Sequence, residues 1–141
     1  MADPLSISAS VAGLLSLAIQ VSQLLYAQIQ TTRHAPRDAK ELLDELKAIE
    51  GVLKRLDAFL REQNIDARNF GATSMLAEAI QGCTVKILDI QGRVEKLNKH
   101  SVGGLVERGK WYYKQDERRE IVAYLHRSLT IFQLSLSVEG M

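Results

Sequence analysis

The sequence predicts an all-α protein, folded as an antiparallel four-helix bundle with a long apolar N-terminal helix. Four segments carry apolar residues at alternating spacings of three and four, which line up on one face of a helix. No segment shows the apolar–polar alternation of a half-buried strand bounded by hairpin turns. The 141 residues, of which 46% are hydrophobic, suffice for one core but not for two. We therefore expect a single domain over residues 1–141, with helices at about 4–31, 37–63, 74–99 and 116–138.

The first helix is expected to begin at Pro4, because the first helical position needs no backbone N–H. Its apolar stripe comprises Ile7, Val11, Leu14, Ala18, Val21 and Leu25. A second stripe at the same rhythm, called the polar stripe below, comprises Ser6, Ser10, Gly13, Ser16, Gln20, Gln23 and Gln30. No charged residue occurs from Pro4 to Thr32. This pattern predicts an amphipathic helix whose water-facing side holds hydroxyls, amides and a glycine but no charge.

The second helix combines an apolar stripe with a strongly charged opposite face. The stripe comprises Leu42, Leu46, Ile49, Leu53, Leu56 and Leu60. Residues 33–72 hold eight basic and eight acidic side chains, mostly away from that stripe. We interpret these charges as a solvated surface with ion pairs four residues apart.

The third helix has the most regular stripe, which comprises Leu76, Ile80, Cys83, Ile87, Ile90, Val94 and Leu97. Because Cys83 lies within the stripe, it is expected to be a buried structural thiol and not a nucleophile. Gly82 and Gly92 each disfavour a helix, so they are expected to allow close packing of a neighbour or to mark a bend.

The fourth helix is expected to begin at Asp116, whose carboxylate can cap the free N–H groups of the first turn. Its stripe comprises Val122, Leu125, Leu129, Phe132 and Leu136. Packing four such stripes around one core completes the predicted bundle.

The chain shows no constellation of residues that predicts an enzyme, a metal site or a cofactor. His34, His100 and His126 have no partner at metal-ligand spacing, and no glycine-rich phosphate loop is present. The charge balance, 18 Lys and Arg against 17 Asp and Glu, disfavours a dedicated nucleic-acid binder. The single cysteine excludes a disulfide within the chain, and the acidic Asp3 stands where a signal peptide needs a basic residue.

The first helix is long enough to cross a bilayer, since Leu5 to Ile29 covers 25 residues and a core of roughly 30 Å needs about 20. The residues expected to enter a membrane are Leu5, Ile7, Val11, Leu14, Leu15, Leu17, Ile19, Val21, Leu24 and Leu25. The same pattern is also typical of a core helix in a soluble bundle. What distinguishes this helix is its uncharged water-facing side, which could enter lipid without carrying a charge along.

A second unusual segment places three aromatic residues between lysines. The candidate interfacial patch comprises Lys110, Trp111, Tyr112, Tyr113, Lys114, Arg118 and Arg119. Aromatic residues beside Lys and Arg suit the headgroup region of a membrane. Two alternatives are that the aromatic residues plug one end of the bundle, or that they stack on single-stranded nucleic acid, which the neutral overall charge disfavours.

These two segments resemble the fungal HeLo-like domain, the N-terminal domain of fungal STAND (NOD-like receptor) proteins. The opening of that family resembles Asp3 to Ile7 and its continuation Ala9 to Leu15. The aromatic triplet from Trp111 to Tyr113, followed by a helix with Leu125 and a Ser/Leu-rich end through Ser137, resembles its closing region. Family members often have Trp-Pro-Phe at the triplet, where this chain has Trp-Tyr-Tyr. The resemblance covers nearly the whole chain.

The resemblance implies a cell-death execution module in fungal innate immunity or heterokaryon incompatibility. Such modules are held inactive in the cytoplasm by a C-terminal sensor domain or an amyloid-signalling partner. On activation they self-associate, and the N-terminal helix permeabilises the plasma membrane, for which anionic lipids are the expected partners and nucleic acid is not. The alternative is a soluble domain that brings receptors together by homotypic association without acting on membranes.

Overall fold

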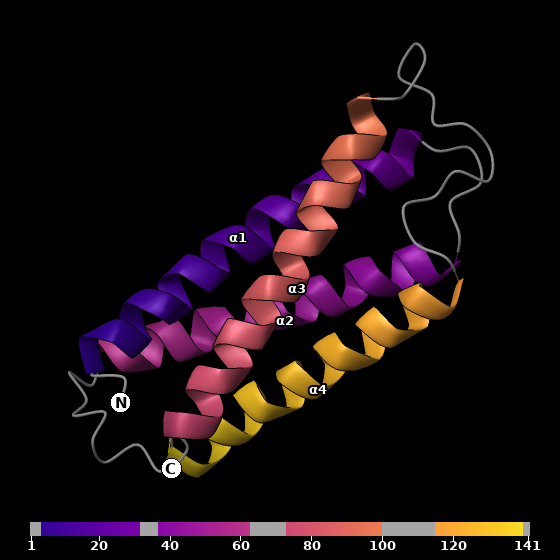
Figure 1. The fold of residues 1–141 in the computed structure, drawn as a ribbon. Coiled ribbons are helices and arrows are strands. Elements are labelled where there is room, and N and C mark those ends of the chain that lie inside the picture. The colour runs from indigo at the N-terminus through magenta and orange to yellow at the C-terminus, as the bar shows by residue number, and fades with distance from the viewer. Residues whose placement is uncertain (1–3, 32–36, 63–72, 100–114, 140–141) are drawn as a thin grey trace.

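The computed structural model describes residues 4–31, 37–62, 73–99 and 115–139, all of them helical (Figure 1). The four helices are α1 (Pro4–Thr31), α2 (Arg37–Glu62), α3 (Thr73–Lys99) and α4 (Gln115–Glu139). No strand occurs in these ranges. The predicted all-α bundle with a long apolar N-terminal helix is therefore confirmed.

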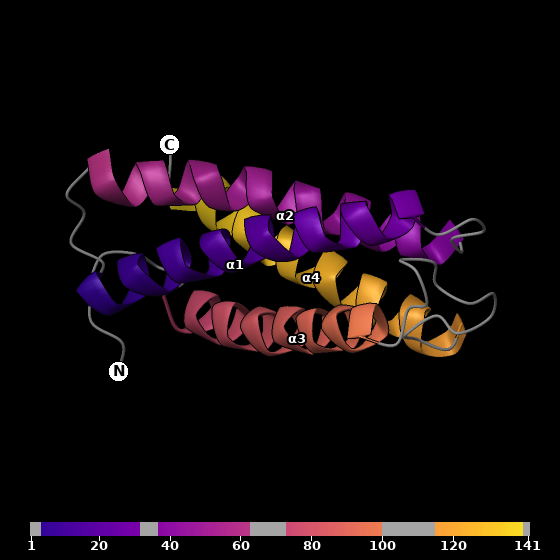
Figure 2. The ribbon, with the colours of Figure 1, turned by 90° about the horizontal axis from the view of Figure 1, so that it is seen from above.

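Each helix runs antiparallel to the helix that precedes it in the chain (Figure 1). α1 packs against α2 and α3, and α4 packs against the same two helices from the other side. Seen from above, α2 and α3 therefore lie on opposite edges of the bundle, with α1 and α4 between them (Figure 2). As a consequence α1 lies beside α3 in parallel, and so does α2 beside α4, although these pairs are not consecutive.

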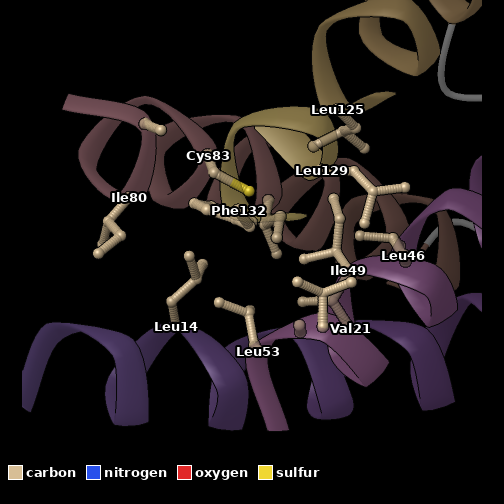
Figure 3. Close-up of a cluster of buried hydrophobic side chains, with 14 of the residues drawn as sticks. Leu14, Val21, Leu46, Ile49, Leu53, Ile80, Cys83, Leu125, Leu129 and Phe132 are labelled. Atoms are coloured by element: carbon tan, nitrogen blue, oxygen red, sulfur yellow. The ribbon is translucent and has the colours of Figure 1, made fainter. Parts of the chain in front are cut away.

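The core is formed by apolar side chains that converge from all four helices (Figure 3). Leu14 of α1, Leu53 of α2, Cys83 of α3 and Phe132 of α4 are among those that meet there, and all four are almost completely inaccessible to water. Burying a leucine or phenylalanine side chain contributes about 1.5–3 kcal/mol, so the four stripes supply the main driving force for folding.

The predicted stripes are buried wherever the structure describes their side chains, apart from two positions in α4. Val122 and Leu136 are only half-buried, and Ile121 is buried in the place expected for Val122. The stripe of α4 is thus turned by about one residue at its start. Ile7 and Leu97 fall outside the side chains that the structure describes.

Charges on α2 pair four residues apart, as its sequence predicts. Arg37 lies 3.6 Å from Glu41, and Arg61 lies 3.2 Å from Asp57. Exposed pairs of this kind contribute about 0–1 kcal/mol each. They keep the outer face of α2 hydrated and contribute little to which helices pack against α2.

The two glycines of α3 have different surroundings. A Cβ atom at Gly82 would overlap the hydroxyl group of Tyr124 in α4, whereas one at Gly92 would meet no atom within 4 Å. Close packing is therefore the reason for glycine at position 82 only. α3 continues as one helix through both positions.

Cys83 is fully buried, as predicted for a structural thiol. Burial raises the pKa of its thiol to about 12, against a smaller lowering by a hydrogen bond with Ser128. A thiol held in its protonated form is a poor nucleophile.

Candidate functional site

α1 is the candidate functional element, and one side of it forms part of the core. Val11, Leu14, Ala18, Val21 and Leu25 are buried against the rest of the bundle. Two of these five are leucines, and Ala18 offers a single methyl group. The partly buried Leu15, Leu17, Leu24 and Ile29 also pack against the core, so α1 is held by apolar contacts along its whole described length.

The opposite side of α1 is exposed and uncharged. The polar stripe lies on this side, and its members Ser10, Gly13, Ser16, Gln20, Gln23 and Gln30 are exposed. Ser6 falls outside the side chains that the structure describes. α2 carries Asp, Glu, Lys or Arg at 13 of its 26 positions, and α1 carries none at its 28. An exposed helix of this length without a charge is unusual in a soluble bundle.

α1 has the length and composition to cross a membrane. The segment Ala9–Gln30 contains 22 residues, which at 1.5 Å per residue covers about the 30 Å thickness of a bilayer core. Only 33% of its most apolar window is buried inside the bundle. A buried core helix of a soluble protein can pass the same test of length and composition, so the uncharged exposed side is the more specific feature.

The residues expected to enter a membrane fall into two groups. Val11, Leu14, Val21 and Leu25 are buried in the core. A second group is half-buried at the edges of α1 and comprises Leu15, Leu17, Ile19 and Leu24. Leu5 and Ile7 are outside the described side chains. None of the eight described residues is fully exposed, so α1 would have to separate from the bundle or turn within it before these side chains could meet lipid.

Two polar residues of α1 are buried, which the sequence analysis did not identify. Ser22 is 5% exposed and Gln28 is 4% exposed. The hydroxyl of Ser22 makes no hydrogen bond within the part of the chain that the structure describes. In α4, by contrast, Ser128 donates to the carbonyl oxygen of Tyr124 at 3.2 Å. Leaving a buried hydroxyl unpaired costs about 1–3 kcal/mol, so Ser22 weakens the attachment of α1.

One cation–π contact connects the exposed side of α1 to α2. The Nζ atom of Lys47 lies 5.3 Å from the ring centroid of Tyr26. At an exposed site such a contact contributes about 0.5–1 kcal/mol. This pair is not visible in the sequence, because the two residues belong to different helices and neither interrupts a stripe.

The candidate interfacial patch lies mostly outside the described residues. Lys110, Trp111, Tyr112, Tyr113 and Lys114 all fall there. The other two members are in the first turns of α4, where Arg118 is half-buried and Arg119 is exposed. The structure thus places these two arginines at the start of α4.

The one histidine in the described helices, His126, contacts a carboxylate of α2. Its Nδ1 atom lies 3.2 Å from Oε1 of Glu45, at an exposed position. His34 and His100 lie outside the described residues. Within the described ranges no group of three His, Cys, Asp or Glu side chains is arranged to hold a metal ion.

Comparison with known protein families gives a match over most of the chain. Residues 2–128 match the family model described as "Pigment biosynthesis cluster protein PigL N-terminal". The matched range contains α1, α2 and α3 whole and α4 as far as Ser128. The comparisons with curated proteins and with solved structures gave no match.

Proposed function

We propose that this chain, which belongs to the PigL N-terminal family, is a HeLo-like effector domain. In this role it permeabilises membranes in regulated cell death. In this proposal the domain rests in the cytoplasm and acts at the plasma membrane after self-association. A C-terminal sensor domain or an amyloid-signalling partner supplies the trigger. The proposed activity includes no catalytic step, no cofactor or metal, and no nucleic acid.

The observation that carries the proposal is the uncharged exposed side of α1. A helix that leaves the bundle for a bilayer pays about 2.5–3.5 kcal/mol for each Asp, Lys or Arg brought to the bilayer centre. α1 contains no such residue from Pro4 to Thr31. Its exposed positions are instead serine, glutamine, glycine, alanine and one tyrosine, so entry into lipid carries a much smaller penalty.

The attachment of α1 to the bundle is consistent with a releasable helix. The buried hydroxyl of Ser22 has no hydrogen-bond partner within the described helices, and it therefore opposes docking of α1. Apolar side chains such as Leu14 lose protein contacts on release but regain an apolar environment in the bilayer. Self-association would concentrate several copies of α1 at one place on the membrane. Anionic lipids are the expected partners, through Arg119 and the basic residues of the interfacial patch.

Leakage of dye from anionic vesicles tests the proposal. The full chain is fused to a module that dimerises on addition of a small molecule, so that association does not limit the result. Gly13→Glu and Gln20→Glu place a charge on the exposed side of α1, where each should spare the bundle. We expect both to reduce leakage at least about tenfold, since one charge at the bilayer centre costs more than the 1.4 kcal/mol of a tenfold change.

The matched control is Gln133→Glu, which makes the same chemical change at an exposed position of α4. It should leak as the unsubstituted chain does. Equal leakage from Gln20→Glu, Gln133→Glu and the unsubstituted chain would exclude insertion of α1. Circular dichroism and urea unfolding of each variant verify that the bundle is intact.

A second candidate function is a soluble homotypic adaptor. The observation that favours it is the burial of the described apolar stripe of α1, from Val11 to Leu25, which a core helix fully explains. An adaptor would form concentration-dependent oligomers and neither bind nor leak anionic vesicles. Light scattering and vesicle co-sedimentation of the same preparation separate the two functions.

A further inference from the structure

α3 directs the charges in its central part toward α4. The Nζ atom of Lys86 lies 5.1 Å from the ring centroid of Tyr124. Arg93 lies 3.4 Å from Glu117 of α4 and 3.2 Å from Asp89 on its own helix. Lys86 and Arg93 therefore lie toward the side of α3 that faces α4, and Asp89 is held there by its ion pair with Arg93.

Apart from Lys86, Arg93 and the 48% exposed Asp89, which pairs with Arg93, the outer surface of α3 between Glu78 and Glu95 carries no charge. This uncharged part of α3 comprises Gln81, Thr84, Val85, Leu88, Gln91 and Gly92. Val85 is 60% exposed and Leu88 is 49% exposed, which makes them two of the large apolar side chains that the described bundle leaves in water. Thr84 donates its hydroxyl hydrogen to the carbonyl oxygen of Ile80 at 2.7 Å, so it requires no outside partner.

This surface adjoins the exposed side of α1. α1 and α3 pack against each other and run in the same direction (Figures 1 and 2). Together the exposed side of α1 and the uncharged part of α3 form a continuous region without a charged residue, here called the uncharged face. Charged residues of the described helices lie mainly on α2, at the start of α4 and on the side of α3 that faces α4.

We propose that the uncharged face is the surface through which two copies of this chain associate while folded; this inference rests on the self-association included in the proposed function. A two-fold interface places each group opposite or near its own copy, so any charge close to the axis meets a like charge. A face without charges is free of that repulsion and is therefore complementary to itself. Val85 and Leu88 supply an apolar centre, and glutamines such as Gln20 and Gln81 can exchange hydrogen bonds around it.

The size of the uncharged face fits a stable dimer. α1 contains 28 residues and is about 42 Å long, whereas the uncharged part of α3 covers the 16 residues between Glu78 and Glu95, about 24 Å. At a helix width of about 10 Å the two together cover about 660 Å². A standard protein interface buries about 600–1,000 Å² on each partner.

Lipid is a poorer occupant of the same face in the folded state. The face offers no lysine or arginine to an anionic headgroup, and its glutamine amides would lack partners in hydrocarbon. A second copy supplies those partners. Association of folded copies would therefore come first, and contact of α1 with the membrane would follow.

Cysteine cross-linking of the full chain tests the proposal. Leu88→Cys places a thiol on the uncharged face, and Leu134→Cys places one at a comparable exposure, 55%, on the outer side of α4. The native Cys83 is buried, so it should not compete under mild oxidation. We expect Leu88→Cys to form covalent dimers at micromolar concentration and Leu134→Cys to form none.

Sedimentation of lysine variants gives the second measurement. Leu88→Lys should weaken dimerisation at least about tenfold, because each copy adds one charge to a symmetric interface, whereas Leu134→Lys should leave it unchanged. Equal cross-linking at both positions, or a Leu88→Lys variant that dimerises as well as the unsubstituted chain, would overturn the proposal.

Leakage measured on the same variants separates this inference from the proposed function. If the inference holds, Leu88→Lys loses leakage and forced dimerisation restores it. A chain that permeabilises vesicles and whose dimerisation is unaffected by Leu88→Lys contradicts the inference alone. A chain that dimerises through Leu88 but leaks under no condition contradicts the membrane function alone.

Discussion

The hydroxyl end of Tyr124 lies directly against Gly82, in the space that a side chain at position 82 would occupy. The tyrosine ring also has two cationic groups near it, with Lys86 Nζ at 5.1 Å and the guanidinium carbon of Arg127 at 5.6 Å from its centroid. The contact brings α4 close to α3 at this point. It explains why a residue that disfavours helices is placed in the middle of α3.

Substituting Gly82 by alanine should destabilise the bundle even though alanine is the better helix former. Overpacking costs about 1–3 kcal/mol, which exceeds the gain of about 1 kcal/mol in helix propensity. Gly92→Ala is the matched control, and it should raise the free energy of unfolding by up to about 1 kcal/mol because its Cβ meets nothing. Tyr124→Phe removes the overlapping oxygen and should rescue Gly82→Ala. Urea unfolding measures all four chains, and a stabilised Gly82→Ala would contradict the contact.

A Cβ atom at Gly82 would meet Tyr124 and one at Gly92 would meet no atom within 4 Å, and the sequence alone does not distinguish these two positions. Both lie in the same helix outside its apolar stripe, and the spacing of apolar residues identifies the side of α3 that faces the core but not the atoms that contact the other sides. The apolar stripes predicted the four helices, because one side of a helix can be buried only if its apolar residues recur every three or four positions, whichever helices lie beside it. They did not reveal that α2 and α3 lie on opposite edges, since that arrangement depends on how all four stripes pack together.

In the candidate site, too, features of a single helix are predictable from the sequence and contacts between helices are not. The uncharged exposed side of α1 is visible in the sequence, because the periodicity assigns Gln20 and its neighbours to the water-facing side. The burial of Ser22 and the contact between Tyr26 and Lys47 depend on α2 and could not be read from α1 alone. Serine at the edge of an apolar stripe is compatible with either burial or exposure.

Ser22→Ala should strengthen the attachment of α1. Removing a buried hydroxyl that has no partner should raise the free energy of unfolding by about 1 kcal/mol. Ser128→Ala is the control, because that hydroxyl donates to the carbonyl oxygen of Tyr124 and its loss should be neutral or destabilising. If release of α1 limits permeabilisation, Ser22→Ala should also slow vesicle leakage. A less stable Ser22→Ala chain would show that the hydroxyl does have a partner.

The buried thiol of Cys83 predicts how stability responds to alkaline pH. Burial raises its pKa from 9.0 to about 12, so the folded state holds the proton more tightly than the unfolded state does. The contribution of the protonated thiol is fully present below about pH 9 and is lost as the pH rises toward 12. Cys83→Ala should therefore flatten the fall of the free energy of unfolding over this range. At pH 8 the folded chain should react with a thiol reagent far more slowly than the chain in urea, and equal rates would contradict the burial.

The absence of carboxylates in α1 predicts the ion selectivity of the membrane lesion. A pore lined by the polar stripe would present hydroxyls and amides but no ring of acidic side chains, which is what cation channels use. Reversal potentials in planar bilayers under a salt gradient should therefore lie near zero. The lesions that Gln20→Glu still forms should shift toward cations, while those of Gln133→Glu should not. A sharp cation preference of the unsubstituted chain would mean that carboxylates from another helix line the lesion, and that α1 alone does not form it.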